Sequence, residues 1–286
     1  MSTIKTILAP VGDAQAAQAP LEAAFRLAAL FGAHVTALHV RPDPTSAVPL
    51  IGEGMSGAMV EEMLNTAEKQ GRDAAAAARA VYDDLRGRHS VTEQSAPPAE
   101  TVTTQWLEVV GREEEVIAHK GRVADMVVMG HPGTGLDDTS GLSLNAALLD
   151  SGRPLLLAPA AMPGSMGKRV VVAWNGSAES GRAVAAALPI LEKAEAVTVL
   201  TVNEHDSLAC ADELVGFLGW HGIKAEHRDV PAGGNAGMAV LDACKDAAAD
   251  MLVMGAYTHS RLRQLILGGV TRHVLAHAAI PVLLSH

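Results

Sequence analysis

The chain has few aromatic residues and almost no cysteine. Phe, Trp and Tyr make up 3% of its 286 residues, so its interior must be built mainly from Ala, Val, Leu and Met. This composition suits helices that pack closely on a parallel sheet. The two cysteines, Cys210 and Cys244, form neither a CxxC pair nor a disulfide framework, which is typical of a reducing compartment. We therefore expect a cytoplasmic protein.

Excess positive charge and long apolar runs are also missing. The formal net charge of −10 opposes general binding to nucleic acids and to anionic membranes. No stretch approaches the roughly 18 apolar residues of a membrane span. The N-terminal sequence, with a single Lys and a short hydrophobic run, does not resemble a signal peptide. We expect neither a nucleic-acid partner nor a membrane partner.

Several catalytic motifs are absent as well. The sequence contains no GxxxxGK[ST] loop, no GxSxG, no HExxH and no GxGxxG between a strand and a helix. His273 and His277 are four residues apart and would be neighbours on a helix, but no third ligand follows at motif spacing. A solvated or packed helix face is therefore favoured over a metal site. We identify no catalytic residue and no metal ligand.

What the chain does contain is two copies of one unit. Three segments of the first half correspond, in the same order, to three of the second: KTILAPVGDA (5–14) to KRVVVAWNGS (168–177), ADMVVMGHPG (124–133) to ADMLVMGAYT (249–258), and RPLLLAP (153–159) to IPVLLSH (280–286). Conserved order indicates a tandem duplication. The boundaries that we predict are an N-terminal unit at 1–160, a Gly- and Pro-rich linker at 161–167 and a C-terminal unit at 168–286.

Short apolar runs bounded by Gly, Pro or Asp predict the strands, and Ala-rich segments between them predict helices. The predicted strands of the first unit are 6–11, 34–40, 103–109, 126–130 and 155–158. Those of the second unit are 170–174, 197–202, 224–230, 251–255 and 282–285. Their alternation with helices predicts an α/β fold of two Rossmann-like, doubly wound, parallel five-stranded sheets. Ligands of such sheets bind outside the carboxyl ends of the strands.

The first unit carries an additional segment. Lys5 and Lys168 lie 163 positions apart, whereas Ala124 and Ala249 lie 125 apart, which leaves about 38 extra residues in the first unit (163 − 125). Most of them fall in a strongly helical run at 56–88 that follows a Gly-rich stretch at 51–57. A longer crossover helix is favoured, and a lid or partner surface is the alternative.

Features that suit an anion gather after the fourth strand of the second unit. Gly268 and Gly269 precede Val270 and Thr271 at a predicted helix start, where backbone amides and the helix dipole attract phosphate. The segment 255–286 contains no acid but three arginines, Arg261, Arg263 and Arg272. The alternative is a tight turn that binds nothing.

With these residues the chain resembles a tandem universal stress protein. Nucleotide-binding members of that family carry Gly, two residues, Gly, nine residues and Gly-Ser/Thr after the fourth strand. The second unit matches the spacing at Gly255, Thr258 and Gly268, but has Thr258 in place of the second Gly and Gly269 in place of Ser or Thr. Asn175 stands where the family has an Asp after its first strand, so a carboxylate contact to base or metal is lost.

The resemblance implies a stress-response protein that binds ATP, or alternatively ADP or AMP, in its second unit as a regulatory ligand. Enzymatic activity would be limited to slow ATP hydrolysis, because a P-loop Lys and a nearby general base are lacking. The candidate cofactor-binding residues are Ala173, Trp174, Asn175, Val202, Met254, Gly255, Thr258, His259, Arg261, Gly268, Gly269, Val270 and Thr271. For Trp174, stacking on adenine and packing at a domain interface remain equal alternatives.

The first unit departs further from the family pattern. It keeps Gly130 and Gly133 but has Ser143 and Leu144 in place of the later glycine pair. Three acids, Asp137, Asp138 and Asp150, follow without a compensating Lys or Arg before Arg153. We expect the first unit to be a structural or regulatory copy that does not bind a triphosphate.

The resemblance also implies how the units are joined. In the family the final strands of two units pair antiparallel, which would place 155–158 against 282–285 and make the chain a pseudo-dimer. A further homodimer or a protein partner is compatible with this arrangement. The main alternative to nucleotide binding is an interaction scaffold in which both sites are degenerate.

Overall fold

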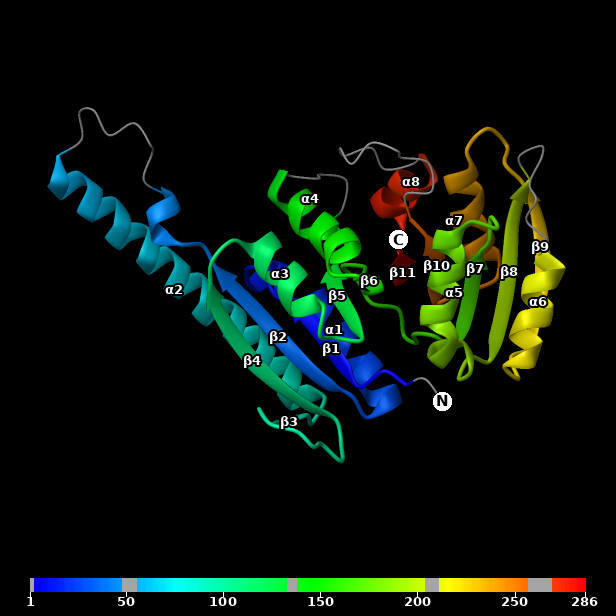
Figure 1. The fold of residues 1–286 in the computed structure, drawn as a ribbon, viewed down its shortest axis with the longest axis horizontal. Coiled ribbons are helices and arrows are strands. Elements are labelled where there is room, and N and C mark those ends of the chain that lie inside the picture. Colours follow the sequence, from blue (N-terminus) through cyan, green and yellow to red (C-terminus); the bar gives the residue numbers. More distant parts are fainter. Residues whose placement is uncertain (1–2, 48–55, 133–137, 204–210, 257–268) are drawn as a thin grey trace.

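The computed structural model describes residues 3–47, 56–132, 138–203, 211–256 and 269–286 (Figure 1). Strands of the first unit are β1 (Thr6–Pro10), β2 (His34–Arg41), β3 (Thr92–Glu93), β4 (Thr103–Val110), β5 (Met126–Gly130) and β6 (Leu155–Ala158). Strands of the second unit are β7 (Arg169–Ala173), β8 (Ala196–Asn203), β9 (Ala225–Pro231), β10 (Met251–Gly255) and β11 (Val282–Ser285). All ten predicted strands are confirmed within one or two residues at each end. Only β3 was not predicted, because it is two residues long and fully exposed.

Helices connect these strands. The first unit contains α1 (Ala14–Phe31), the 3₁₀ turn η1 (Pro44–Ala47), α2 (Gly57–Arg88), α3 (Glu113–Gly121), α4 (Asp138–Asn145) and the π-helical turn η2 (Ala146–Asp150). The second contains α5 (Ala178–Leu191), α6 (Ala211–Trp220), α7 (Ala236–Asp246) and α8 (Gly269–His277). The first helix of each unit starts at a capping side chain: Asp13 accepts from the Ala16 amide, and Ser177 accepts from the Ser180 amide.

The two units share one sheet. Its strand order is β3-β4-β2-β1-β5-β6-β11-β10-β7-β8-β9, and every neighbouring pair is parallel except β6 and β11. In that antiparallel pair Leu156 lies opposite Leu283. The expected pairing of the final strands is thus confirmed. As a result the two predicted sheets join into a single eleven-stranded sheet, to which the first unit contributes six strands and the second five.

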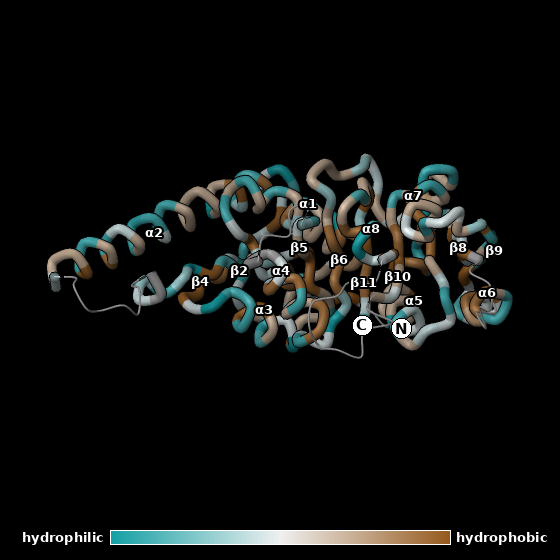
Figure 2. Tube along the Cα trace, turned by 90° about the horizontal axis from the view of Figure 1, so that it is seen from above, coloured by the Kyte–Doolittle hydropathy of each residue, from teal (hydrophilic) through white to brown (hydrophobic). Residues whose placement is uncertain are grey.

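Apolar side chains cover both faces of this sheet. One core cluster packs α1, α2, α5 and α6 against residues such as Val35, Val172 and Val253. The other packs α3, α4, α7 and α8 against residues such as Val127 and Leu252. Figure 2 shows the hydrophobic colour concentrated along the strands and more hydrophilic positions on the surrounding helices. Burial on both faces explains why these strands appear in the sequence as continuous apolar runs.

The additional segment of the first unit forms α2, the crossover helix between β2 and the β3–β4 pair. Its second half packs into the core through Ala75, Ala78, Tyr82 and Leu85. Its first half extends beyond the end of the sheet (Figures 1 and 2). The additional segment is therefore a helix between β2 and β3, as the sequence predicted, while the Gly-rich stretch before it lies largely outside the described residues.

The predicted linker is held by contacts to both units. Arg26 of α1 donates to the Pro163 carbonyl at 2.5 Å, and Ser165 donates to the Asp250 carboxylate at 2.6 Å. Met166 is 7% exposed. The segment between β6 and β7 is thus an ordered part of the structure.

Across the described ranges of the chain, no helix combines the length and the apolar character needed to cross a bilayer.

Candidate functional site

The carboxyl ends of three strands of the second unit come together at one place. Met254 of β10 lies beside Ala173 of β7, and Ala173 lies beside Leu200 of β8. Ala173, Val202 and Val270 are each partly exposed and pack against the cluster that contains Met254. Four of the predicted cofactor residues, far apart in sequence, therefore belong to or border one apolar cluster on the same face of the sheet, and we call these four residues the strand-end wall.

The first turn of α8 adjoins this wall through Val270. Gly269, the first residue of α8, is exposed, and a Cβ added to it would have no atom of the described chain within 4 Å. Thr271 lies within the first turn and is 5% exposed, so it is a packed residue of the helix. A helix start of this kind presents backbone N–H groups and a partial positive charge, both of which suit an anion.

Trp174 is on the other face of the sheet. Its backbone N–H donates to the Leu200 carbonyl at 2.8 Å, so it continues the strand and alternates with Ala173. The ring packs against the cluster formed with α5 and α6, and its Nε1 is buried without a hydrogen-bond partner among the described residues. The structure therefore does not bring Trp174 to the strand-end wall.

Asn175 is exposed at the turn between β7 and α5. Its Oδ1 accepts a hydrogen bond from the Ser177 amide at 3.2 Å, directly before the helix that Ser177 caps. The side chain thus stabilises the local turn. Its amide nitrogen carries donors that the carboxylate found in the family at this position would lack.

Gly255 is in contact with the start of α5. A Cβ added there would lie 2.5 Å from the Ser180 backbone nitrogen and 2.9 Å from Cβ of Glu179. The glycine is therefore required for helix packing in this unit, independently of any ligand.

Sequence reasoning missed Glu179. Its side chain is 17% exposed and pairs with Arg182 at 2.9 Å. Burial alone would raise the pKa of Glu179, but hydrogen bonds and the nearby charges of Arg182 and His286 outweigh burial and lower it. An ionised carboxylate thus lies beside Gly255, although no acid occurs between Gly255 and His286 in the sequence. The only sequence signal was the position of Glu179 in the first turn of the helix after β7.

Four candidate residues lie outside the described residues: Thr258, His259, Arg261 and Gly268. Arg263 lies outside them too. Of the three arginines expected near a phosphate, Arg272 alone is described, as an exposed residue of α8. The described part of the site is therefore the strand-end wall, the first turn of α8 and the Asn175 turn.

The corresponding position in the first unit is filled. Ser143 and Leu144, which replace the glycine pair, are each 3% exposed and lie within α4. Ser143 donates to Glu113 at 2.9 Å. The helix thus runs through the position at which α8 begins in the second unit, so no helix start is available there.

Other candidate sites show no convergent chemistry. The rings of His273 and His277 stack at 4.4 Å, and Nδ1 of His277 contacts the His273 carbonyl oxygen at 2.9 Å. Within the described residues, no group of three or more His, Cys, Asp or Glu could hold a metal ion. Cys244 is 3% exposed, and burial raises the pKa of its thiol to about 12, which leaves it a core residue.

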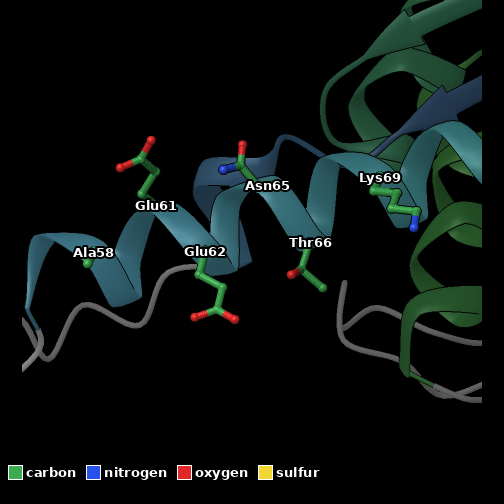
Figure 3. A pocket seen from close by; sticks show the side chains of 6 residues that line it. All are labelled: Ala58, Glu61, Glu62, Asn65, Thr66 and Lys69. Carbon is green, nitrogen blue, oxygen red and sulfur yellow. The ribbon is translucent and has the colours of Figure 1, made fainter.

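A hollow on the surface of α2 is shown in Figure 3. It is lined by Ala58, Glu61, Glu62, Asn65, Thr66 and Lys69. All six come from one helix, with Glu61 and Asn65 on one side and Glu62 and Thr66 on the other. Because no second element faces them, they do not form a ligand site.

Comparison with known proteins agrees with this architecture. A universal stress protein from Archaeoglobus fulgidus aligns over 99% of this chain and 96% of its own, with a TM-score of 0.67 and 18% identity. A putative universal stress protein from Pseudomonas aeruginosa aligns over 99% of this chain and 93% of its own, with a TM-score of 0.57 and 14% identity. In sequence, 50 residues are 46% identical to a universal stress protein of Synechocystis, a match that spans 18% of this chain and 17% of that relative.

The model of the Universal stress protein family matches the chain twice, over residues 3–147 and 166–286. The first range contains β1 to β5 and the second contains β7 to β11, while β6 lies between the two matches. The chain therefore belongs to the universal stress protein family and carries two family units in tandem.

Proposed function

We propose that the second unit binds an adenine nucleotide, ATP with ADP or AMP as alternatives, as a regulatory ligand in a cytoplasmic stress response. The observation that carries the proposal is the strand-end wall of Ala173, Val202, Met254 and Val270 beside the first turn of α8. Ala173, Val202 and Val270 are partly exposed and apolar, which suits the face of a base, and an adjacent helix start suits phosphate.

Charge favours one direction for the phosphates. The Glu179 carboxylate lies beside Gly255, at the start of α5, and would repel them there. Arg272 is exposed on α8, whose first turn adds its own partial positive charge. We therefore place the phosphates towards α8 and away from α5.

The filled position in the first unit supports binding of one nucleotide per chain. Buried Ser143 and Leu144 occupy the place that Gly269 leaves open in the second unit. The ligand would then act on one half of a continuous sheet, and its effect would reach the other half through the β6–β11 pair.

The test is calorimetric titration of the full chain with ATP, ADP and AMP, compared with Gly269→Leu. We expect micromolar affinity for the wild type, about −8 kcal/mol. Among the described residues, leucine at position 269 meets no atom within 4 Å of its Cβ, so the fold should be retained while the approach to the α8 amides is blocked. Affinity should fall at least about tenfold.

Gly141→Leu is the matched control, because Gly141 lies in α4 of the first unit and also has no atom within 4 Å of an added Cβ. It should bind nucleotide like the wild type. Ser143 is unsuitable as a control because it is buried and bonded to Glu113. Absence of heat with all three nucleotides at millimolar concentration would rule out the proposal, and unchanged affinity of Gly269→Leu would move the site elsewhere.

An interaction scaffold is the second candidate. The side chain of Asn175 is engaged with the Ser177 amide, and the Glu179 carboxylate adjoins Gly255, both of which favour a site that has lost its ligand. This candidate predicts that ATP, ADP and AMP produce no heat of binding in the same calorimetric titration.

A further inference from the structure

Helix α6 lies at one end of the molecule, over the last two strands of the sheet. It packs on β8 and β9 through Ala211, Leu214 and Leu218, which are all at most 5% exposed. Figures 1 and 2 place it at the end opposite α2, and none of the other helices that the structure describes covers its outer side. What α6 presents outward is therefore open to a partner.

The outward side carries two large aromatic residues. Trp220 is 92% exposed and Phe217 is 43% exposed, in a chain that has only 3% aromatic residues. The ring of Phe217 packs against His221 at 4.7 Å, but Trp220 has most of its surface in water. Such burial-prone side chains on a surface helix mark an interaction site when they lie together.

The same side of α6 also carries a glycine, Gly216, which has no side chain to cover the helix backbone. Gly216 lies four residues before Trp220, so the two are on one face of the helix. A Cβ added to Gly216 would meet no atom within 4 Å in the part of the chain that the structure describes. The exposed indole of Trp220 and the uncovered backbone at Gly216 thus lie on one face of the helix.

We propose that this face binds a second copy of the chain through an antiparallel α6–α6 pair. With a twofold axis that crosses the outward face of α6 at the level of residue 218, Trp220 of each copy lies over Gly216 of the other, because the two residues are equally far from that level. Such an interface is isologous: each contact occurs twice. Trp220 then loses its contact with water without displacing any side chain.

Charges along α6 suit the antiparallel direction. Asp212 and Glu213 are exposed at the N-terminal end, and the Asp212 side chain is 88% exposed. His221 and Lys224 are exposed at the C-terminal end. Antiparallel pairing brings the acidic end of one copy beside the basic end of the other, and it also sets the two helix dipoles antiparallel, so that the N-terminus of each helix lies beside the C-terminus of the other. A parallel pair would instead place like charges together.

Two short helices bury less surface than a permanent dimer needs. Interfaces below about 1,200 Å² in total are weak and transient. The expected result is a concentration-dependent dimer with a dissociation constant on the order of 10 to 100 μM.

Sedimentation equilibrium of the full chain between about 5 and 500 μM tests the proposal across that range. Trp220→Ala should weaken the dimer at least about tenfold because the projecting side chain is lost. Gly216→Leu should do the same while Trp220 stays intact, because the new side chain fills the space that the indole occupies. The new Cβ at position 216 has no described atom within 4 Å, so this variant should remain folded.

Two controls separate the interface from general surface effects. Gly181→Leu places the same side chain on α5, also with no atom within 4 Å of the new Cβ, and should leave dimerisation unchanged. Met238→Ala removes an exposed apolar residue of α7 and should also have no effect.

Charge reversal tests the direction of the pair. Asp212→Lys and Lys224→Glu should each weaken the dimer, and the double variant should regain most of the affinity. A chain that stays monomeric at the highest concentration overturns the proposal, even if another protein binds α6. A dimer that survives both Trp220→Ala and Gly216→Leu overturns it as well.

Discussion

The fourth strands of the two units, β5 and β10, have nearly the same sequence, yet their carboxyl ends differ in their surroundings. A Cβ added to Gly255 would lie 2.5 Å from the Ser180 nitrogen, whereas the nearest atom to one added at Gly130 would be Cδ of Pro20, at 3.7 Å. The helix after the first strand therefore approaches the fourth strand more closely in the second unit. The same glycine is a packing requirement in one copy and is replaceable in the other.

The largest expected effect follows from this difference. Gly255→Ala should lower the free energy of unfolding by about 3 kcal/mol, because backbone atoms of α5 must move away from the new methyl group. Urea denaturation measures the loss. Gly130→Ala, the matched change in the first unit, should stay within about 0.5 kcal/mol of the wild type. Equal losses in the two variants would show that the closer approach of α5 has no energetic consequence.

The N-terminal ends of β5 and β10 differ less than their carboxyl ends. Asp125 accepts from the Lys5 and Thr6 amides at 2.8 and 2.9 Å, and Asp250 accepts from the Lys168 and Arg169 amides at 3.2 and 2.9 Å. Each carboxylate thus ties the start of the fourth strand to the start of the first. Each carboxylate also accepts from a hydroxyl, Asp125 from Thr6 at 3.2 Å and Asp250 from Ser165 of the linker at 2.6 Å, but Asp250 is only 5% exposed.

Removal of these carboxylates should therefore have unequal costs. Asp250→Ala should lower the free energy of unfolding by about 2 kcal/mol, because three donors lose their acceptor in a buried place. Asp125→Ala should cost about half as much, since its surroundings are more exposed. The Asp250 variant should also be cleaved faster by protease between β6 and β7, where Ser165 is released. A cost for Asp125→Ala equal to that for Asp250→Ala would contradict this.

Much of this architecture could be predicted from the sequence, because the strands are buried on both faces. Burial of that kind leaves continuous apolar runs such as 126–130 and 251–255, which also repeat in the two units. β3 gave no such signal, since its two residues are exposed. The π-helical turn at Ala146–Asp150 gave none either, because its residues are ordinary helix formers.

The candidate site could be predicted only in part. The predicted ends of the strands were enough to identify Ala173, Val202 and Met254 as residues of one site. These side chains lie on the same face because side chains alternate along a strand. The same alternation places Trp174 on the opposite face, because Trp174 still pairs with β8 through its backbone N–H. The sequence did not show how far the pairing of β7 continues. The approach of Glu179 to Gly255 is a tertiary contact between segments 76 positions apart (255 − 179), and no local pattern reports it.

The residue after each fourth strand gives the third difference between the two copies. His131 and Ala256 both donate their backbone N–H to the last strand of their own unit, at 2.8 and 2.9 Å. The His131 side chain is directed towards the other unit and bonds to the backbone at Val274 of α8. Its Nε2 is buried without a hydrogen-bond partner among the described residues. Alanine at position 256 offers no equivalent contact.

The smallest expected effect is a pH dependence that only the first copy can supply. Burial lowers the pKa of His131 more than its hydrogen bond to the Val274 backbone raises it, so the folded chain holds this imidazole neutral. The unfolded chain binds the proton more readily. The contribution of His131 is therefore present above the unfolded pKa of about 6.5 and is lost as the pH falls below it.

His131→Ala should make the free energy of unfolding fall less steeply between about pH 7.5 and pH 5.5. Burial also lowers the pKa of His34. This residue is present in the wild type and in the variant, so its contribution cancels when the two pH dependences are compared. An identical slope in the two proteins would mean that this histidine does not couple the first unit to α8 through its neutral form.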